Sequence, residues 1–370
     1  MSNYQIRSLD QACNKVMLEI LRGSPIETDR LTICFDRQPD IFALARCKYD
    51  DFYYDGLYDG ETLKGFGMAG YHRGLVNGEP AELFCARDLY ILPESRGRGF
   101  VAKSTENHFR EHLHRAPVGY GVIMHGNSAS LRFVGRKPEN NRYSPGSMII
   151  NQLMINTIML AWPVPQNSKY AIRRAQMDDI PEIVRLLVAE HRDRLFGHIY
   201  TEASFPGYLM RNTGLSIGDY FLAFDRSGKC CGVCAAWDMH QMKQTRILRY
   251  GRAFFPSRIA WKAFTVLFNR PSLPKPGGHF REVTITDYAA RDRDPEVMNA
   301  LLRAVYREYR QLCYHFMIWG SSADDPLLTA ASGFMRQAVL SNIILFSAND
   351  KWLEDGAVRN HLPYIDISGI

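Results

Sequence analysis

The chain has 370 residues, of which 46% are hydrophobic, 12% aromatic and 23% charged, and Lys+Arg exceed Asp+Glu by 45 − 39 = 6. This length and composition predict about two globular domains with buried cores. The mild positive charge comes without a basic tail or zinc-finger spacing, so we expect an anionic small ligand and no nucleic-acid partner.

The N-terminal part of the chain carries a strand and helix pattern that recurs later. Residues 1–10 lack the basic and apolar pattern of a signal peptide. Eight cysteines in a chain of this length do not suggest a disulfide scaffold, which predicts a reduced, cytoplasmic setting. Residues 4–21 read as a short strand followed by apolar positions at helical spacing. Residues 170–187 repeat this plan, and GFGMAG (65–70) resembles GVCAAW (232–237) at nearly the same offset. Two matches at one offset predict tandem copies of one domain type.

Each half reads as a strand, helices, several strands, a helix and further strands, which is a mixed α/β plan. The Pro-bearing stretch WPVPQNSK (162–169) reads as a short linker. We therefore place the two domains at 1–163 and 169–370.

A strand, a glycine loop and a helix follow one another near residue 96. Residues 82–92 are rich in β-branched, aromatic and aliphatic side chains, and Pro93 ends this predicted strand. Residues 100–115 contain no helix breaker. Between them stand Arg96, Gly97, Arg98 and Gly99.

The chemistry of this loop favours phosphate. Glycines let backbone N–H groups approach a ligand, a helix N-terminus adds partial positive charge, and arginines supply forked donors. The loop lacks the Lys-Ser/Thr of a Walker motif and the third glycine of a Rossmann fingerprint. We interpret it as a pyrophosphate-binding turn, and a basic surface turn is the alternative that these residues alone leave open.

The wider context resembles the acyl-CoA-binding segment of the GNAT (N-acetyltransferase) superfamily, in which a strand leads into Arg/Gln-x-x-Gly-x-Gly/Ala. In LYILPESRGRG (89–99), Arg96 and Gly99 fit the first two fixed positions, while Val101 stands where a small residue is usual. NSASLRFVGR (127–136) resembles the next signature of the superfamily, an Asn followed by a helix.

This resemblance implies two tandem GNAT-like domains of the α/β (α+β) class, each a mixed, mostly antiparallel sheet flanked by helices. It implies that the strand before the loop splays from its neighbour and that an amine attacks the thioester of acetyl-CoA, or of another acyl-CoA, directly. The implied cofactor-binding residues are Ile91, Leu92, Arg96, Gly97, Arg98, Gly99, Phe100, Val101 and Asn127. Ile91 and Leu92 would pair with the pantetheine amide, and the Asn127 side chain would help to hold the pantetheine end of CoA.

Catalytic residues are less evident. In the family, a carboxylate or His on the strand before the loop often acts as base, but strict alternation places Arg87 on the face of Leu89 and Ile91. Glu82 reaches that face only through a bulge. A tyrosine that often protonates the sulfur corresponds to Val134 here. The candidates that remain are Glu82, His125 and Tyr143. Arg87 could pair with a carboxylate of the acceptor or form a structural ion pair.

Other features of the chain favour structural roles. Residues 148–164 are apolar but interrupted and too short to span a bilayer, so we expect one or two buried strands and no membrane partner. Cys231 and Cys234 lack a second pair at zinc spacing and read as buried thiols. His108 and His112 are expected on a solvated helix face, and no metal is expected.

The second half departs from the family pattern at its loop. RDRDPEVMNALL (291–302) contains no glycine, and its acidic residues would repel phosphate, so we expect this copy to have lost acyl-CoA binding. Trp237, Asp238 and Tyr250 read as part of a buried aromatic cluster, with acceptor recognition as the alternative. Residues 361–370 alternate as a final half-buried strand.

The function inferred from these patterns is an acyl-CoA-dependent N-acyltransferase, with a small amine or a peptide amine as acceptor. The rivals are a non-catalytic acyl-CoA-binding regulator and a protein-interaction module. The sequence does not determine the acceptor, the acyl chain length or the oligomeric state.

Overall fold

A computed structural model of the chain describes residues 4–28, 30–97, 99–100, 103–104, 106, 108, 115–116, 118–132, 134, 146–347, 358 and 361–370. The strands are β1 (Tyr4–Leu9), β2 (Ile26–Glu27), β3 (Leu31–Asp36), β4 (Asp51–Asp59), β5 (Thr62–Val76), β6 (Glu79–Ile91), β7 (Val118–Met124), β8 (Gly146–Met159), β9 (Ala171–Arg174), β10 (Gly197–His198), β11 (Tyr220–Phe224), β12 (Cys230–Trp237), β13 (Gln244–Tyr250), β14 (Glu282–Ala290), β15 (Phe316–Ser322) and β16 (Arg336–Ser347). The α-helices are α1 (Asn14–Arg22), α2 (Ala43–Lys48), α4 (Ser128–Leu131), α5 (Ile180–His191), α6 (Phe205–Arg211), α7 (Phe255–Leu267) and α8 (Pro295–Gln311), and a further helix begins at Phe100. The short 3-10 helices are η1 (Gln11–Cys13), η2 (Pro93–Ser95), η3 (Met177–Asp179), η4 (Ile217–Asp219), η5 (Arg252–Phe254), η6 (Arg291–Arg293), η7 (Pro326–Ala331) and η8 (Ile367–Gly369).

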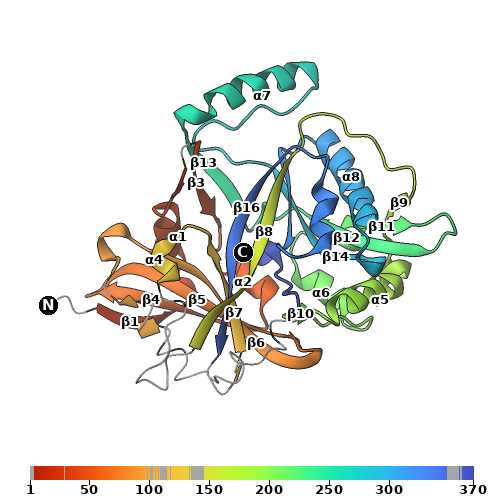
Figure 1. Ribbon diagram of the computed structural model, residues 1–370. Coiled ribbons are helices and arrows are strands. Elements are labelled where there is room, and N and C mark those ends of the chain that lie inside the picture. Colours follow the sequence, from red (N-terminus) through yellow and green to blue (C-terminus); the bar gives the residue numbers. More distant parts are fainter. Residues whose placement is uncertain are drawn as a thin grey trace.

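One large mixed sheet runs through both halves of the chain (Figure 1). Its strand order is β1-β4-β5-β6-β7-β16-β8-β15-β14-β12-β11-β9, and β10 pairs with β5. Only β6–β7 and β14–β15 are parallel among the pairs of described strands in this sheet. This is the mixed, mostly antiparallel α/β plan expected from the sequence.

The two halves exchange strands at the middle of this sheet. β16, from the C-terminal half, lies between β7 and β8 of the N-terminal half, and β8 in turn pairs with β15. The sheet is therefore continuous across the middle of the molecule. The domain limits 1–163 and 169–370 remain a prediction, since β8 and β16 pair across that division.

Helices cover both faces of β12. Cys234 and Ala236 pack in the core that contains α8, whereas Val233 and Ala235 pack in the core that contains α5. Because both faces are covered, the strand is a continuous apolar run rather than an alternating one. The prediction that Cys231 and Cys234 are buried thiols in a strand is confirmed, and all eight cysteines are free.

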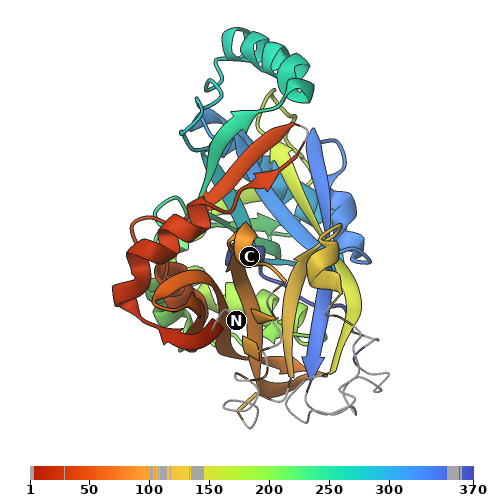
Figure 2. The same ribbon diagram turned by 90° about the vertical axis from the view of Figure 1, so that its left-hand side faces the viewer.

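A second, smaller sheet also contains strands from both halves of the chain. β13, from the C-terminal half, pairs antiparallel with β3, which also pairs with β2, both from the N-terminal half. β13 leads through η5 into α7, which stands apart from the other helices at the top of the molecule (Figures 1 and 2). Among the described residues no helix has the length and apolar character to cross a membrane.

Most elements read from the sequence are present. Residues 4–21 form β1, η1 and α1, and residues 170–187 form the matching β9, η3 and most of α5. Residues 148–164 contribute to a single strand, β8.

The prediction of a final strand at 361–370 is wrong. The segment makes one isolated bridge, between Leu195 and Pro363, and then forms η8. Its apolar residues Tyr364, Ile365 and Ile367 are all buried. Alternating apolar and polar residues predict a strand with one face in solvent. This segment is enclosed by the protein, so the alternation does not indicate a strand here.

Candidate active site

β6 separates from β7 shortly before the glycine loop. The two strands are parallel partners from Leu83–Val118 to Ala86–Gly121. Beyond that point β6 remains paired with β5 as far as Ile91, while β7 remains paired with β16 as far as Met124. The splay that the GNAT resemblance implies is thus present, and it opens towards the loop.

A β-bulge interrupts β6 inside the splay. The register with β5 shifts opposite Gly67, and Asp88 takes a positive φ of 54°. The side chains of Arg87 and Asp88 are both buried, whereas Leu89 is 44% exposed. The alternation that placed Arg87 on the face of Leu89 and Ile91 is therefore wrong, because a bulge adds one residue and resets the faces.

The loop after β6 turns through two glycines in left-handed conformation. Gly97 has φ 75° and Gly99 has φ 78°, and a Cβ at either position would meet no atom within 4 Å. The helix begins at Phe100, whose side chain is buried, and the Lys103 N–H donates to the Gly99 carbonyl (3.1 Å). The buried Phe100 side chain thus anchors the loop to the core, while the two glycines border open space. N–H groups at the start of such a helix have no intrahelical acceptor, which is the geometry that an anion requires.

The other expected cofactor contacts flank this loop. The Ile91 carbonyl accepts from Arg96 Nε (3.2 Å), and Arg96 is otherwise exposed. Both backbone groups of Leu92 are bonded within the chain, its N–H to Lys64 and its carbonyl to Ser95. Contacts of Ile91 and Leu92 with a cofactor remain predictions, and for Leu92 they require those bonds to open. Arg98 and Val101 lie outside the described residues.

Asn127 lies beyond the end of β7 and caps α4. Its side-chain oxygen accepts from the Ser130 N–H (3.2 Å), and its own N–H donates to Met124 (3.0 Å). The predicted helix after Asn127 is therefore present, although the described part is short. A contact with pantetheine remains a prediction.

The sequence-based candidates for the base are not gathered at the splay. Glu82, at the opposite end of β6, forms an ion pair with Arg115 (2.7 Å). His125 is exposed beyond β7, where its backbone N–H donates to Leu340 (3.1 Å). Tyr143 lies outside the described residues.

His108 is packed rather than solvated, contrary to expectation. Its Nε2 lies 2.6 Å from the Tyr71 hydroxyl and the two rings stack. The helix face that carries it is therefore turned towards β5. His112 lies outside the described residues, and the described residues contain no cluster of His, Cys, Asp and Glu able to hold a metal ion.

A buried ion pair at the bulge escaped the sequence analysis. Arg37, which follows β3, donates from both terminal nitrogens to the Asp88 carboxylate (2.7 and 2.8 Å), and the Tyr54 hydroxyl adds a third bond. The Arg37 and Asp88 side chains are only 2% and 5% exposed. Burial alone would raise the pKa of Asp88, but Arg37 and Arg87 lower it to about 2. No local pattern could have paired residues so far apart in sequence.

Lys243 lies beside this cluster and Glu282 lies beside Lys243, and both have a pKa near neutrality. Burial, reinforced by repulsion from Arg37 and Arg87, lowers the pKa of Lys243 to about 7. Burial raises the pKa of Glu282 to about 7, although Thr245 donates to its carboxylate (2.7 Å). Both can exchange protons at neutral pH, as a general acid or base must. The signal that could have found Glu282 is a carboxylate at the first position of an otherwise buried strand.

The end of the described chain lies near the middle of the molecule (Figure 1), against the same cluster. The Ile370 carbonyl accepts from Lys243, and a Cβ at Gly369 would stand 3.4 Å from Arg87 Nη1. Lys48 and Asp366 form a further ion pair beside it (2.8 Å). The splay, the bulge and the titratable pair are thus connected through residues of both halves.

The residues considered for acceptor recognition make contacts typical of structural side chains. Trp237 is fully buried, donates to the Thr213 carbonyl (3.0 Å) and packs under Lys48. Asp238 accepts from the Tyr314 hydroxyl. The Tyr250 hydroxyl donates to Pro274 (2.7 Å), on the loop beyond α7. These hydrogen bonds run to three different segments, and a role in acceptor recognition remains a prediction for all three residues and for Arg87.

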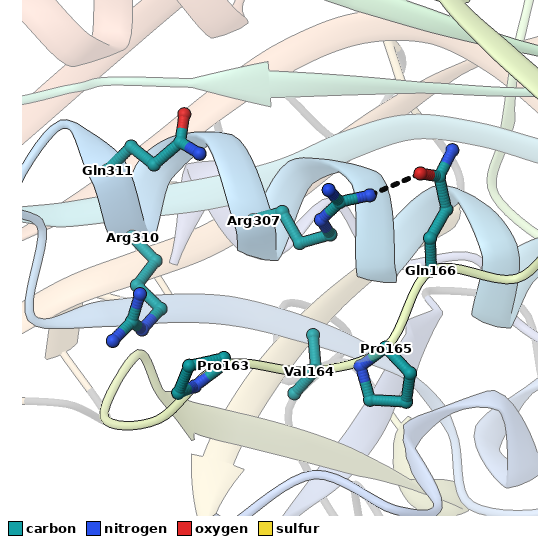
Figure 3. Close-up of a pocket in the computed structure, with 7 residues that line it drawn as sticks. All are labelled: Pro163, Val164, Pro165, Gln166, Arg307, Arg310 and Gln311. Carbon is teal, nitrogen blue, oxygen red and sulfur yellow. Dashed lines mark hydrogen bonds between the residues drawn. The ribbon is translucent and has the colours of Figure 1, made fainter. Parts of the chain in front are cut away.

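A shallow hollow lies elsewhere, between the connecting segment and α8 (Figure 3). It encloses about 340 Å³ and is lined by Pro163, Val164, Pro165, Gln166, Arg307, Arg310 and Gln311. Arg307 points at Gln166 and donates to it, and Arg310 Nε donates to Ala161 (3.4 Å). Because the polar groups of the hollow bond within the chain and none belongs to the β6 turn, we assign it no ligand.

Comparisons with known proteins support the fold resemblance. No protein-family model and no curated protein matches the sequence. Among solved structures, the chain is similar to Saccharomyces cerevisiae N-myristoyltransferase with bound myristoyl-CoA (TM-score 0.61, 12% identity, 94% of this chain and 78% of that one). It is also similar to a GCN5-related N-acetyltransferase from Sphaerobacter thermophilus (TM-score 0.57, 12% identity, 100% and 99%). A probable N-acyltransferase from Enterococcus faecalis matches at TM-score 0.50, with 12% identity over 95% and 75% of the chains. The GNAT resemblance noted in the sequence is thereby confirmed as a likeness of fold.

Proposed function

We propose that the chain is an acyl-CoA-dependent N-acyltransferase whose donor site is the splay and glycine loop at the end of β6. One observation carries this proposal: β6 leaves β7 after Ala86 and Gly121, immediately before a left-handed glycine loop that opens outward at a helix start. The gap between β6 and β7 can hold the extended pantetheine of an acyl-CoA, and the helix start offers N–H donors for the diphosphate of the CoA. The similar fold of yeast N-myristoyltransferase, which was crystallised with bound myristoyl-CoA, supports the same assignment.

In this proposal the diphosphate contacts residues 96–101, the pantetheine lies along Ile91 and Leu92, and the Asn127 side chain helps to hold the pantetheine end of CoA. We take acetyl-CoA as the donor to be tested first. The yeast enzyme with a similar fold was crystallised with myristoyl-CoA, so the acyl chain length must be measured. A donor of this kind fits the cytoplasmic location expected from the sequence.

The acceptor in this proposal is a primary amine, on a small molecule or a peptide. Its nitrogen attacks the thioester carbon, the new C–N bond forms as the C–S bond breaks, and the CoA sulfur leaves as a thiolate. The amine must lose one proton and the thiolate must gain one. We assign the proton transfer to Lys243 and Glu282, because both have a pKa of about 7, Lys243 interacts with the charges of Arg87 and Asp88 at the splay, and Glu282 interacts with Lys243.

A non-catalytic acyl-CoA-binding regulator is the second candidate. It is favoured by the positions of Glu82, which is engaged by Arg115, and His125, which lies exposed beyond β7. Thiol release with a panel of amines distinguishes the two candidates. Release that is lost in Glu282→Gln, with CoA binding intact, supports the enzyme. Binding without thiol release for any amine supports the regulator.

Calorimetry with CoA tests the donor site itself. We expect Gly99→Glu to weaken CoA binding at least about 100-fold, since a carboxylate would stand in the anion site at a strained φ. Gly228→Glu is the matched control, because Gly228 has φ 79° and equally open surroundings but lies on the turn between β11 and β12. Equal loss in both variants, or no CoA binding by the wild type, would overturn the proposal and leave a protein-interaction module.

A further inference from the structure

The net positive charge of the chain comes from one segment. Residues 239–281 contain nine Lys and Arg residues and no Asp or Glu. The remainder of the chain has 45 − 9 = 36 basic and 39 acidic residues, a balance of −3. This segment contains β13, η5, α7 and the loop that returns to β14.

Helix α7 is attached to the body by one face. Trp261 is buried, donates to the Pro271 carbonyl (2.9 Å) and stacks on His315. Phe264 packs against Trp162. The rest of the helix stands clear of the sheet in both views (Figures 1 and 2).

The outward face of α7 is apolar. Phe255 is 61% exposed, Ile259 58%, Val266 79% and Leu267 72%. At about 100° per residue these four, together with Ala263, fall within one arc of roughly 120° on the helix. Large exposed apolar side chains are common singly, but a contiguous group on one helix face marks a contact surface.

Cations border this apolar arc. Arg258 and Lys262 lie along one edge of it, where the helical wheel places them next to Phe255. Arg249, Arg252 and Lys275 are exposed on the flanking segments. None of these five side chains is within ion-pair distance of a described carboxylate, since the described ion pairs of the segment involve Arg246 and His279 only.

We propose that α7 docks the protein on an anionic membrane surface, with its apolar arc inserted between the headgroups and its cations on lipid phosphates. A short helix with aromatic and aliphatic residues on one face and Lys and Arg beside them has the composition of an interfacial helix. This association differs from spanning, so it revises the sequence-based expectation of no membrane partner without requiring a transmembrane segment.

The size of the surface favours a bilayer over a protein partner. The four large side chains each offer on the order of 100 Å² of apolar surface, whereas a stable protein interface needs about 800 Å² on each side. A helix of 13 residues is about 20 Å long and projects from the body, so it meets a flat surface without obstruction. Nucleic acid would bind the cations but not the aliphatic arc.

Vesicle co-sedimentation of the full chain tests this proposal. We expect binding to vesicles that contain phosphatidylglycerol and little binding to vesicles of phosphatidylcholine alone. Each cation near an anionic surface contributes about fivefold in affinity, so the pair Arg258→Glu and Lys262→Glu should weaken binding at least about 25-fold. Raising the salt from about 0.1 M to 1 M shortens the Debye length from about 10 Å to 3 Å and should release the protein.

Two sets of controls separate docking from general effects. Ile259→Asp with Val266→Asp should abolish vesicle binding, while Met210→Asp should not, because Met210 is 81% exposed on α6, outside the segment. Arg226→Glu with Lys229→Glu is the matched charge control on the exposed turn between β11 and β12. Circular dichroism should show that all variants keep the fold.

Three outcomes would overturn the proposal. The first is equal binding to both kinds of vesicle, and the second is binding that survives the aspartate pair on α7. The third is a wild-type dimer in light scattering that the aspartate pair converts to a monomer without any vesicle binding, which would make this face a contact between copies of the chain. CoA calorimetry is independent of all three, so failure here leaves the donor site untouched.

Discussion

The turn after β6 and the turn after β14 begin from the same backbone plan. Each strand pairs in parallel with its neighbour over only a few residues, at Leu83–Ala86 and at Glu282–Thr284. Each then carries a bulge with an aspartate at positive φ, Asp88 at 54° and Asp287 at 45°. The offset along the chain from Asp88 to Asp287 equals the offset from Leu83 to Glu282, the residues at which the two parallel pairs begin.

The two turns differ beyond the bulge. After β6 the glycine loop leaves the helix start open. After β14 the Asp294 side chain accepts from the Glu296 N–H (2.8 Å), and Arg293 pairs with Asp325 (2.6 Å). Beyond the last parallel pair of β14 and β15, the Tyr288 hydroxyl on β14 also donates to Gly320 and Ser321 on β15 (3.2 and 2.9 Å). A helix start capped by its own carboxylate has no room or charge for a phosphate. The same backbone plan therefore leaves a helix start open after β6 and closes one after β14.

The bulge aspartates should show the largest difference between the halves. Asp88→Asn leaves Arg37 as a buried cation without a full counter-charge and should cost about 3–5 kcal/mol of unfolding free energy. Asp287 instead accepts from the hydroxyls of Tyr200, Tyr208 and Tyr220, and burial with the nearby Asp366 raises its pKa. Because the partners of Asp287 are neutral hydroxyls, which can donate to an amide oxygen or accept from an amide nitrogen, Asp287→Asn leaves no buried cation unpaired among them and should cost only about 1–2 kcal/mol.

Urea unfolding at neutral pH measures both values. The unfolding cooperativity of the wild type serves as the reference, since a change in slope would indicate altered compactness rather than stability. Equal costs for the two variants would mean that the bulges are held by the same interactions, contrary to the contacts described.

Glu282 and Leu83 occupy corresponding positions at the start of the two parallel pairs. The pKa of Glu282 is raised to about 7 from an ordinary value of 4.5. The unfolded chain therefore loses this proton first, and stability falls as the pH rises from 4.5 towards 7 by up to ~1.4 kcal/mol per pH unit. Glu282→Leu should remove this decline and gain about 1–3 kcal/mol on the wild type across that window.

The quantity to compare is the slope of the unfolding free energy against pH. In Glu282→Leu the Thr245 hydroxyl loses its acceptor, which changes the unfolding free energy by an amount that does not depend on pH. Thr245→Val, which keeps the carboxyl group, should retain most of the wild-type decline. A Glu282→Leu curve parallel to that of the wild type would show that the carboxylate titrates normally in the folded protein.

Removing one arginine from each turn should give the smallest effect. Arg96→Ala should weaken CoA binding about tenfold, the loss of one charge-assisted contact to phosphate. Arg291→Ala should leave CoA binding unchanged, because Arg291 pairs with Asp225 (3.0 Å) beside the closed turn. Calorimetry with CoA measures both, and a loss in Arg291→Ala equal to that in Arg96→Ala would place the ligand elsewhere.

Local features were readable from the sequence because they depend on a few neighbouring residues. Glycine at positions of positive φ, Pro93 after a β-rich run and apolar residues at helical spacing predicted the end of β6, the turn and the start of the helix. The acidic residues of 291–302 were likewise readable as unfavourable to phosphate, and Asp294 among them caps the helix start.

Tertiary structure alone decided how these pieces meet. The bulge at Asp88, its pairing with Arg37 and the neutral pKa of Lys243 depend on side chains brought together from distant strands. The insertion of β16 beside β7 and the enclosure of residues 361–370 depend likewise on the summed burial of many apolar groups. Periodicity reports which face of an element is buried, but not what it is buried against, because each long-range contact is weak and only the complete set selects one arrangement.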